Sequence, residues 1–346
     1  TDCRPEDCQR AMSRILPVAV ICALALTMPA VAGAGGFAQR EDVRAFIEEM
    51  HERHGFDRAR LTRLFGQAQP QPKAIQAILP PKDPSVRSWQ AYRARFVEPN
   101  RIEGGLRFWQ AYRQTLEAAR RTYGVPEEII VAIIGIETIY GRNVGKFPAL
   151  ATLATLAFDY PPRAELFRRE LEALLLLARE SHRSPIAYSG SYAGALGIPQ
   201  FLPSSIRNWG VDFDEDGQVD LAASSADAIG SVANFLASHG WDSGSPVVAS
   251  ARAAGERVGE LIDAGILPRF TPVEMTVYGV SSAADAPQLP CALIDLVTPG
   301  EATEYWLGYR NFYVITRYNR SSFYAMAVYA LSQELKAEHE ARLAAR

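Results

Sequence analysis

The chain has 346 residues, of which 48% are hydrophobic and 22% charged, so it can bury a substantial core and is long enough for one large domain or two to three modest ones. Its formal net charge of -3 provides no overall basic field, and no long run of lysine or arginine supplies a local one. The composition therefore excludes nucleic acid as an expected partner and favours an ordinary globular protein.

The first 34 residues resemble an upstream extension followed by a secretory signal peptide. From Met12, one arginine precedes an apolar stretch, and the small residues 30–32 suit cleavage after Ala32 or Ala34. The alternative, an uncleaved anchor helix, fits less well because the apolar run is shorter than the ~20 residues of a membrane span and is broken by prolines. The segment predicts export to the periplasm.

The four cysteines support the same interpretation. Cys3, Cys8 and Cys22 lie in the part predicted to be removed, so Cys291 would be left without a partner for a disulfide or a cysteine metal site. The residues before Cys22 lack the small residue expected ahead of a lipidated cysteine. We therefore expect a soluble, monomeric exported protein that is not a lipoprotein and whose fold depends on its core.

Helical patterns dominate residues 37–245. In 37–123, the N-terminal helical region, Val43, Phe46, Ile47 and Met50 recur at spacings of three and four. A well-delimited helix follows within 124–141, with Pro126 and two glutamates at its start and Gly141 after its end. Further helices are expected at 163–181 and 226–239, so residues 124–245 form a predicted helical core.

Strand signals occur only in the C-terminal region, residues 246–346. Branched and aromatic residues cluster at 273–280 and 292–297, between turn-forming residues. The whole pattern predicts a mainly α protein, in the α+β sense, with a small β element near its C-terminal end.

Glu137 stands at the end of the apolar run VAIIGIETIYGR, in a helix that should be central and buried. A buried carboxylate either pairs with a cation or raises its pKa above about 4.3 and keeps its proton. A protonated carboxylic acid can act as the general acid that cleaves a glycosidic bond. On the helix pattern alone, a structural role remains open, such as pairing with Arg142 or capping a nearby turn.

Several long motifs resemble the membrane-bound lytic murein transglycosylase B family. They are YGVPEEIIVAIIGIETIYGRNVGKFPALATLATLAFDYP, GSYAGALGIPQFLPSSIRNWGVDFDEDGQVDL, DAIGSVANFLASHGW and NFYVITRYNRSSFYAMAVYAL, in that order between residues 96 and 331. The resemblance implies a lysozyme-like helical core that cleaves the bond between N-acetylmuramic acid and N-acetylglucosamine in peptidoglycan without water. It assigns Glu137 as the acid and then the base, with a 1,6-anhydromuramic acid end as product.

A single carboxylate agrees with this chemistry. A hydrolase needs a second Asp or Glu about 5 to 9.5 Å from the first, and none is close to Glu137 in the sequence. A distant residue brought near by folding, such as Asp159 or Asp212, would make the protein a hydrolytic muramidase instead. A third alternative is a peptidoglycan-binding protein without catalysis. In every case the expected partner is the peptidoglycan glycan strand, with cell-wall synthesis or remodelling proteins as further candidates.

The segment GSYAGALGIPQF has small residues that let a polymer approach the backbone, although its composition also fits a turn-rich linker. The resemblance assigns Ser191 and Gln200 to the active site, where hydroxyl and amide groups can bind sugar substituents. Family members often have glycine where Ile198 or Pro199 stands. This chain departs from the family pattern there, so the resemblance does not fix the local backbone.

The segment RYNRSSFYAM provides aromatic and amide groups suited to sugar binding. The resemblance places Tyr318, Asn319 and Tyr324 at the substrate groove, although the helical spacing of Tyr324 also fits a core residue. Tyr92, in WQAYRARF, matches the family only loosely and is the weaker candidate.

The loop DFDEDGQVDL starts like an EF-hand calcium loop. Its twelfth position is Ala223, where that motif has a bidentate glutamate, and a later aspartate resembles the delayed acidic ligand of the family's longer loop. No cofactor is required by the proposed chemistry, and a calcium ion here would be structural. The alternative is an Asp-rich turn closed by its own hydrogen bonds. The predicted ligands are Asp212, Asp214, Asp216, Gln218 and Asp227.

Overall fold

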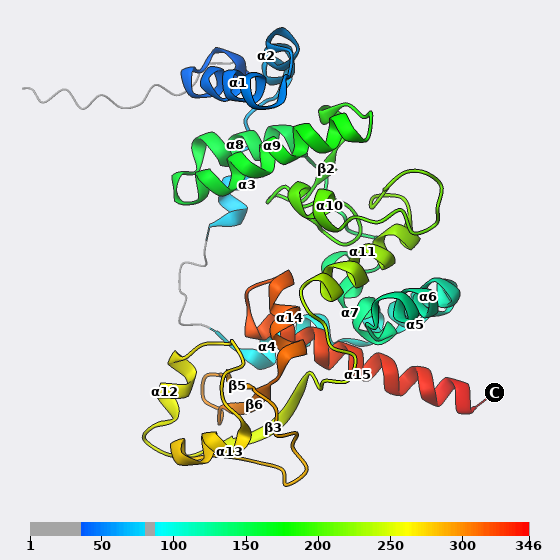
Figure 1. Cartoon of the computed structure of the whole chain (residues 1–346), viewed down its shortest axis with the longest axis vertical. Coiled ribbons are helices and arrows are strands. Elements are labelled where there is room, and N and C mark those ends of the chain that lie inside the picture. The colour runs from blue at the N-terminus through cyan, green and yellow to red at the C-terminus, as the bar shows by residue number, and fades with distance from the viewer. Residues whose placement is uncertain (1–35, 80–86, 346) are drawn as a thin grey trace, which may run out of the picture. The chain divides into compact units, whose positions relative to one another are not determined.

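The computed structural model describes residues 36–79 and 87–345, most of which are helical (Figure 1). The predicted signal segment and its three cysteines lie outside the described residues. Within the described part of the chain, no helix is long and apolar enough to cross a membrane.

The N-terminal helices confirm the predicted apolar stripe. Val43, Phe46, Ile47 and Met50 are at most 4% exposed and form part of the main core. The helices are η1 (Phe37–Gln39, a 3-10 turn), α1 (Glu41–His54), α2 (Arg58–Gln67), α3 (Pro72–Ile78), α4 (Trp89–Phe96), α5 (Pro99–Ala111) and α6 (Arg113–Tyr123).

Helix α7 (Glu127–Thr138) lies at the centre of the core, as its apolar sequence predicts. Residues 129–136 are all buried, and the helix packs against α5, α6, α11 and α15. It ends earlier than expected: Ile139 has φ 53° and Tyr140 has φ 60°, so these two residues leave the helix before Gly141. Left-handed backbone at two successive non-glycine residues is costly and must be held by surrounding contacts.

The rest of the core surrounds α7 and includes a helical hairpin, α8 against α9. The predicted helices at 163–181 and 226–239 are confirmed within one residue at each end. Two short strands pair antiparallel, with Phe147 opposite Gly190. The elements are β1 (Phe147–Pro148), α8 (Ala149–Asp159), η2 (Pro161–Arg163), α9 (Ala164–Glu180), η3 (Pro185–Ala187), β2 (Ser189–Gly190), α10 (Pro203–Trp209) and α11 (Ser225–Ser238).

The C-terminal region contains a four-stranded antiparallel sheet in the order β4-β3-β6-β5. Its neighbour α15 returns to the core and packs against α7, α4 and α5 (Figure 1). The elements are β3 (Val248–Ala253), α12 (Val258–Asp263), α13 (Pro272–Met275), η4 (Thr276–Tyr278), β4 (Val280–Ser282), β5 (Ala292–Leu296), β6 (Glu304–Gly308), α14 (Arg310–Tyr318) and α15 (Ser322–Ala344).

One of the two predicted strands is wrong. Residues 292–297 contain β5, but most of 273–280 is helical, and β4 begins only at the end of that range. Thr271 and Glu274 form a reciprocal capping box that starts α13, and Pro272 takes a first-turn position. These local helix-starting signals outweigh the β preference of the branched residues that follow.

Candidate active site

A large open hollow, with a volume of about 1140 Å³, contains Glu137 and four other predicted site residues, Ser191, Gln200, Tyr318 and Asn319. Its walls come from the end of α7, the start of α9, the loop after β2 and the end of α14. We call this hollow the catalytic groove. Segments far apart in the sequence therefore assemble the residues that the sequence motifs selected.

The Glu137 carboxylate is half-buried at the end of α7 and lines the catalytic groove. Burial raises its pKa to about 7, and a hydrogen bond from the Tyr324 hydroxyl to Oε1, 2.6 Å long, opposes that rise. None of the ion pairs among the described residues includes Glu137, so the pairing with Arg142 is not formed. The group is therefore close to half-protonated near neutral pH.

Tyr324 serves as both a core residue and a partner of the site. Its ring is 2% exposed in α15, and its hydroxyl reaches Glu137, but it does not line the groove. Tyr92 is also outside the groove lining: its ring packs against Phe96 and Phe323, and burial and then the nearby Glu137 carboxylate raise its pKa. Tyr324 therefore contacts the Glu137 carboxylate directly, whereas Tyr92 lies near enough to be affected by its charge.

The other predicted residues are held by backbone contacts. Tyr318 donates a hydrogen bond of 2.5 Å to the carbonyl oxygen of Pro199, which joins α14 to the loop after β2. Gln200, at φ 53°, donates through Nε2 to the carbonyl oxygens of Val144 (3.1 Å) and Gly197 (2.9 Å). These contacts fix the lining of the groove beside Glu137.

Ser191 closes the turn in the same loop. Its Oγ accepts hydrogen bonds from the backbone N–H groups of Ala193 (3.3 Å) and Ala195 (3.1 Å). The hydroxyl hydrogen remains available to donate into the groove that Ser191 lines.

A buried brace holds the end of α7, and the sequence interpretation missed it. Arg101, 8% exposed, donates through Nη1 to the carbonyl oxygen of Gly135, and the Tyr140 hydroxyl donates 2.9 Å to the carbonyl oxygen of Arg101. A Cβ atom at Gly105 or Gly135 would lie 2.5 Å from the Tyr140 hydroxyl oxygen. The adjacent glycines of α5, Gly104 and Gly105, were the one sequence signal for this close approach of the Tyr140 side chain. The brace holds the strained turn that follows Glu137.

The two aspartates considered as second carboxylates lie elsewhere. Asp159 accepts a hydrogen bond of 2.5 Å from Arg40, and Asp212 belongs to the acidic loop described next. Among the described residues that line the groove, Glu137 is the only one with a carboxylate side chain.

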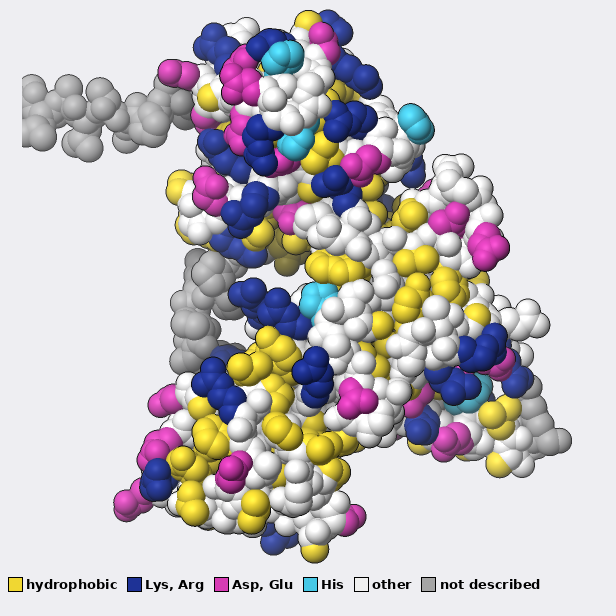
Figure 2. All heavy atoms as spheres, in the orientation of Figure 1, with side chains coloured by type: hydrophobic (Ala, Val, Ile, Leu, Met, Phe, Trp, Pro, Cys, Tyr) yellow, Lys and Arg dark blue, Asp and Glu magenta, His cyan; other side chains and the backbone are white. Residues whose placement is uncertain are grey.

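The remaining charges of the groove are positive. Its lining includes the basic residues Lys146, Arg163, Arg169, Arg317 and Arg320. Figure 2 shows dark blue side chains bordering the hollow between the part of the molecule formed by α9 and that formed by α14. Such a groove favours a substrate that carries negative charge.

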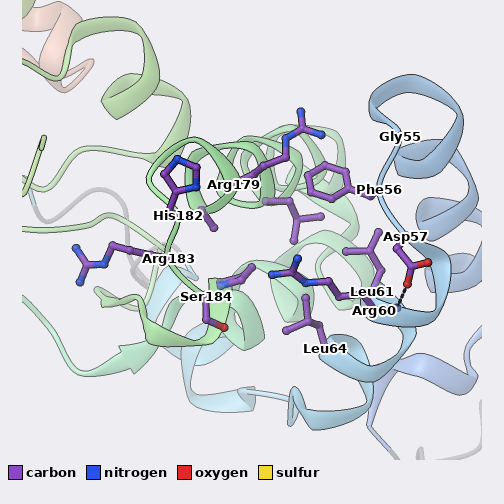
Figure 3. Close-up of a pocket in the computed structure, with 13 residues that line it drawn as sticks. Gly55, Phe56, Asp57, Arg60, Leu61, Leu64, Arg179, His182, Arg183 and Ser184 are labelled. Carbon is purple, nitrogen blue, oxygen red and sulfur yellow. Dashed lines mark hydrogen bonds between the residues drawn. The ribbon is translucent and has the colours of Figure 1, made fainter.

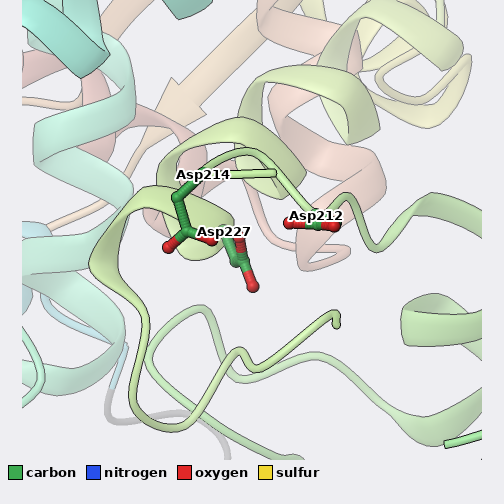
Figure 4. A group of neighbouring side chains, drawn as sticks. All are labelled: Asp212, Asp214 and Asp227. Carbon is green, nitrogen blue, oxygen red and sulfur yellow. The ribbon is translucent and has the colours of Figure 1, made fainter. Parts of the chain in front are cut away.

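Three of the predicted metal ligands come together. Carboxylate oxygens of Asp212, Asp214 and Asp227 lie within 4.8 Å of one another (Figure 4). Asp216 is not in this group, and its Oδ1 accepts the backbone N–H of Gln218. An all-oxygen set of this kind suits calcium.

Asp227 anchors this acidic loop. It is 1% exposed, and its two oxygens accept the backbone N–H groups of Phe213 and Asp220, each at 2.8 Å. Burial raises its pKa, while these hydrogen bonds oppose the rise. The loop is thus closed by its own hydrogen bonds and also presents clustered carboxylates.

A separate cavity of about 520 Å³ lies between the turn joining α1 to α2 and the end of α9 (Figure 3). It contains none of the predicted site residues. Arg179, which lines it, donates 2.7 Å to the carbonyl oxygen of His54 and lies over the Phe56 ring. This arginine already connects α9 to the N-terminal helices, which gives it a structural role.

Comparisons with known proteins agree with the geometry. Residues 38–333 match the family described as the transglycosylase SLT domain. Membrane-bound lytic murein transglycosylase B of Escherichia coli K12 is 40% identical over 313 residues, 86% of this chain and 84% of the relative. Soluble lytic transglycosylase SltB1 from Pseudomonas aeruginosa has a TM-score of 0.80 and 42% identity, covering 86% of this chain and 99% of that one. Escherichia coli Slt35 in complex with calcium has a TM-score of 0.77 and 38% identity, covering 88% and 96%.

Proposed function

Because this chain belongs to the transglycosylase SLT domain family and is a lytic transglycosylase of peptidoglycan, we propose that Glu137 is its single catalytic acid and base. The observation that carries the proposal is a carboxylate with a pKa of about 7 in an open groove. Among the described residues that line this groove, every other charged side chain is basic. A pKa near the working pH allows a group both to give and to accept a proton.

In the first step, protonated Glu137 donates its proton to the glycosidic oxygen between N-acetylmuramic acid and N-acetylglucosamine. The bond to the anomeric carbon breaks as the muramyl ring takes on oxocarbenium character. The carboxylate formed in this way accepts the hydrogen bond of Tyr324, which stabilises its negative charge.

In the second step, the muramyl C6 hydroxyl attacks the anomeric carbon and gives its proton to the Glu137 carboxylate. A 1,6-anhydro ring closes, Glu137 is again protonated, and no water is consumed. The internal hydroxyl takes the place of the nucleophile or base that a second carboxylate provides in hydrolases.

The other groove residues would bind and orient the glycan strand. Ser191 and Asn319 offer polar groups for sugar substituents, and Gln200 and Tyr318 hold the loop that carries Ser191. The basic rim would attract the carboxylates of the peptide stems. Binding at several subsites would hold the C6 hydroxyl close to the anomeric carbon.

The test is mass spectrometry of the fragments that the purified protein releases from sacculi, with Glu137→Gln as the matched variant. Ends that are lighter by one water and resist borohydride reduction are expected, and the variant should release none. Reducible muramic acid ends would establish hydrolysis instead. Binding without any release would support the non-catalytic alternative.

We also propose a structural calcium ion at Asp212, Asp214 and Asp227. The support is the convergence of three carboxylates and the calcium complex of the similar Slt35 chain. Calcium would neutralise the repulsion among these side chains and stiffen the loop before α11. The ion has no part in the proton transfers at Glu137.

The predicted organisation and location extend this proposal. The core 124–245 and the C-terminal region 246–346 would act together, because groove residues come from both, and the helical region 37–123 would support α7 through Arg101. Peptidoglycan as substrate agrees with a periplasmic site of action, and proteins of cell-wall synthesis or remodelling are the expected partners.

A further inference from the structure

A second hollow, of about 430 Å³, lies between α4, α15 and strand β6, outside the catalytic groove. Its floor contains the nearly buried Trp89, and two half-buried aromatic side chains, Trp306 and Tyr329, also line it. Trp306 lies on the face of the sheet opposite to Leu307, which belongs to the separate core of the C-terminal region. The hollow therefore combines aromatic surface with access to solvent.

The rim of this hollow is polar. Gln90 and Gln333 are exposed amides, and Arg93 and Glu334 form an ion pair 3.4 Å long between α4 and α15. Aromatic faces with a few amide and charged groups at the edge are suited to a ligand that is apolar on one face and rich in hydroxyl and amide groups at its edges. A sugar ring with an acetamido substituent has this character.

We propose that this hollow is a second binding site for the glycan strand, one that takes its N-acetylated amino sugars. The proposal rests on the function proposed above and deepens it, because it adds a place where the polymer is held without being cut. Trp306 would stack on a sugar ring, and the two glutamines would bind acetamido and hydroxyl groups.

The surrounding surface has room for more than one sugar. An adjoining hollow of about 350 Å³ shares Glu304 and Trp306 with the first and continues over β3 to Arg252. Trp306 thus lies where the two hollows meet, a suitable position for a stacking platform along an extended chain.

A series of aromatic contacts runs from the second site toward the surroundings of Glu137. The Phe323 ring contacts Trp89 on one side (5.6 Å between centroids) and Tyr92 on the other (5.7 Å). Phe323 immediately precedes Tyr324, which bonds Glu137. Helices α4 and α15 thus connect the hollow to Tyr324, the residue that contacts Glu137.

Isothermal titration calorimetry tests the proposal with a tetramer of β-1,4-linked N-acetylglucosamine as the probe. In the Glu137→Gln background, which cannot cleave, two molecules of probe should bind per protein. Adding Trp306→Ala should leave one, and Trp306→Phe should restore the second with an affinity within about tenfold, because a smaller ring still stacks.

A double variant tests the site independently, in case Trp306→Ala does not fold. Gln90→Ala with Gln333→Ala changes two exposed side chains and should weaken the second binding event by about tenfold, while Gln67→Ala, an exposed glutamine of α2, should change nothing. A single binding event that persists in Trp306→Ala, or two events unaffected by that substitution, would overturn the proposal. Release of anhydro ends, measured separately, reports whether the proposed function itself fails.

Discussion

Glu137 and Asp227 are both carboxyl groups whose pKa is raised by burial, but their hydrogen bonds differ. Glu137 accepts one hydrogen bond, from a tyrosine hydroxyl, whereas Asp227 accepts two from backbone N–H groups that cannot move away. Burial raises the pKa of both groups, and it raises that of Glu137 to about 7. Two fixed backbone donors oppose the rise at Asp227 and suit a carboxyl that organises a loop, whereas a single hydroxyl donor opposes it at Glu137, which remains able to exchange its proton.

The largest effect on stability should come from removing the charge of Glu137. The folded-state pKa of Glu137 is raised from 4.5 to about 7, so the stability it contributes is complete below pH 4.5 and is lost as the pH rises through about 7. Glu137→Gln has no such loss and should exceed the parent in free energy of unfolding by about 3 kcal/mol at pH 8. Urea unfolding at pH 4.5 and pH 8 measures this difference.

The control for this change is Glu128→Gln, at the other end of α7, where the side chain pairs with Lys336 at 3.6 Å. This substitution should give no gain in stability at pH 8. Equal stability of Glu137→Gln and the parent at both pH values would mean that Glu137 is not destabilised by burial.

A smaller effect should follow from removing the Tyr324 hydroxyl, which donates a hydrogen bond to Glu137. Tyr324→Phe deletes the hydroxyl that stabilises ionised Glu137, so the pKa of Glu137 should rise above about 7 and the loss of activity at alkaline pH should move upward by about one pH unit. The rate near neutral pH should also fall by about tenfold, because the carboxylate that accepts the C6 proton loses its fixed position.

A pH–rate profile separates this effect from a change in folding. Tyr313→Phe, on α14, is the matched substitution and should leave the profile in place. An unshifted alkaline limb in Tyr324→Phe would show that the hydroxyl does not act on the charge of Glu137.

The smallest effect concerns the aspartate loop. Calcium should raise the melting temperature by about 3 °C, because an ion that binds only the folded state stabilises it. Asp214→Asn should abolish this rise, whereas Asp263→Asn, an exposed residue of α12, should retain it. If calcium leaves the melting temperature of the parent protein unchanged, the loop is an Asp-rich turn closed by hydrogen bonds.

The sequence predicted the parts of the fold where local signals agree. An unbroken apolar run, flanked by proline, glutamates and glycine, located α7 within a few residues and singled out Glu137. The same reasoning missed β3, whose alanines and serine have little β preference and which becomes a strand by pairing with β4 and β6. Long-range pairing of this kind leaves no local pattern.

The candidate site was predictable only in part for the same reason. The motifs selected five residues that line the groove, because these residues occur in distinctive segments. The brace made by Arg101 and Tyr140 depends on glycines in two different helices, and its hydrogen bonds go to backbone carbonyls. The position of Tyr324 behind Glu137, away from the groove lining, likewise depends on how α15 packs on α7.

The bond between Tyr324 and Glu137 also orders events during synthesis. The two residues are 187 positions apart, and α15 is the last helix of the described chain. A growing chain therefore completes α7 and most of the groove well before it contains the hydroxyl that supports the carboxylate. The fully supported active site therefore requires synthesis to have passed Tyr324, so a glycan-cutting protein of this design cannot reach full competence while only its core has been made.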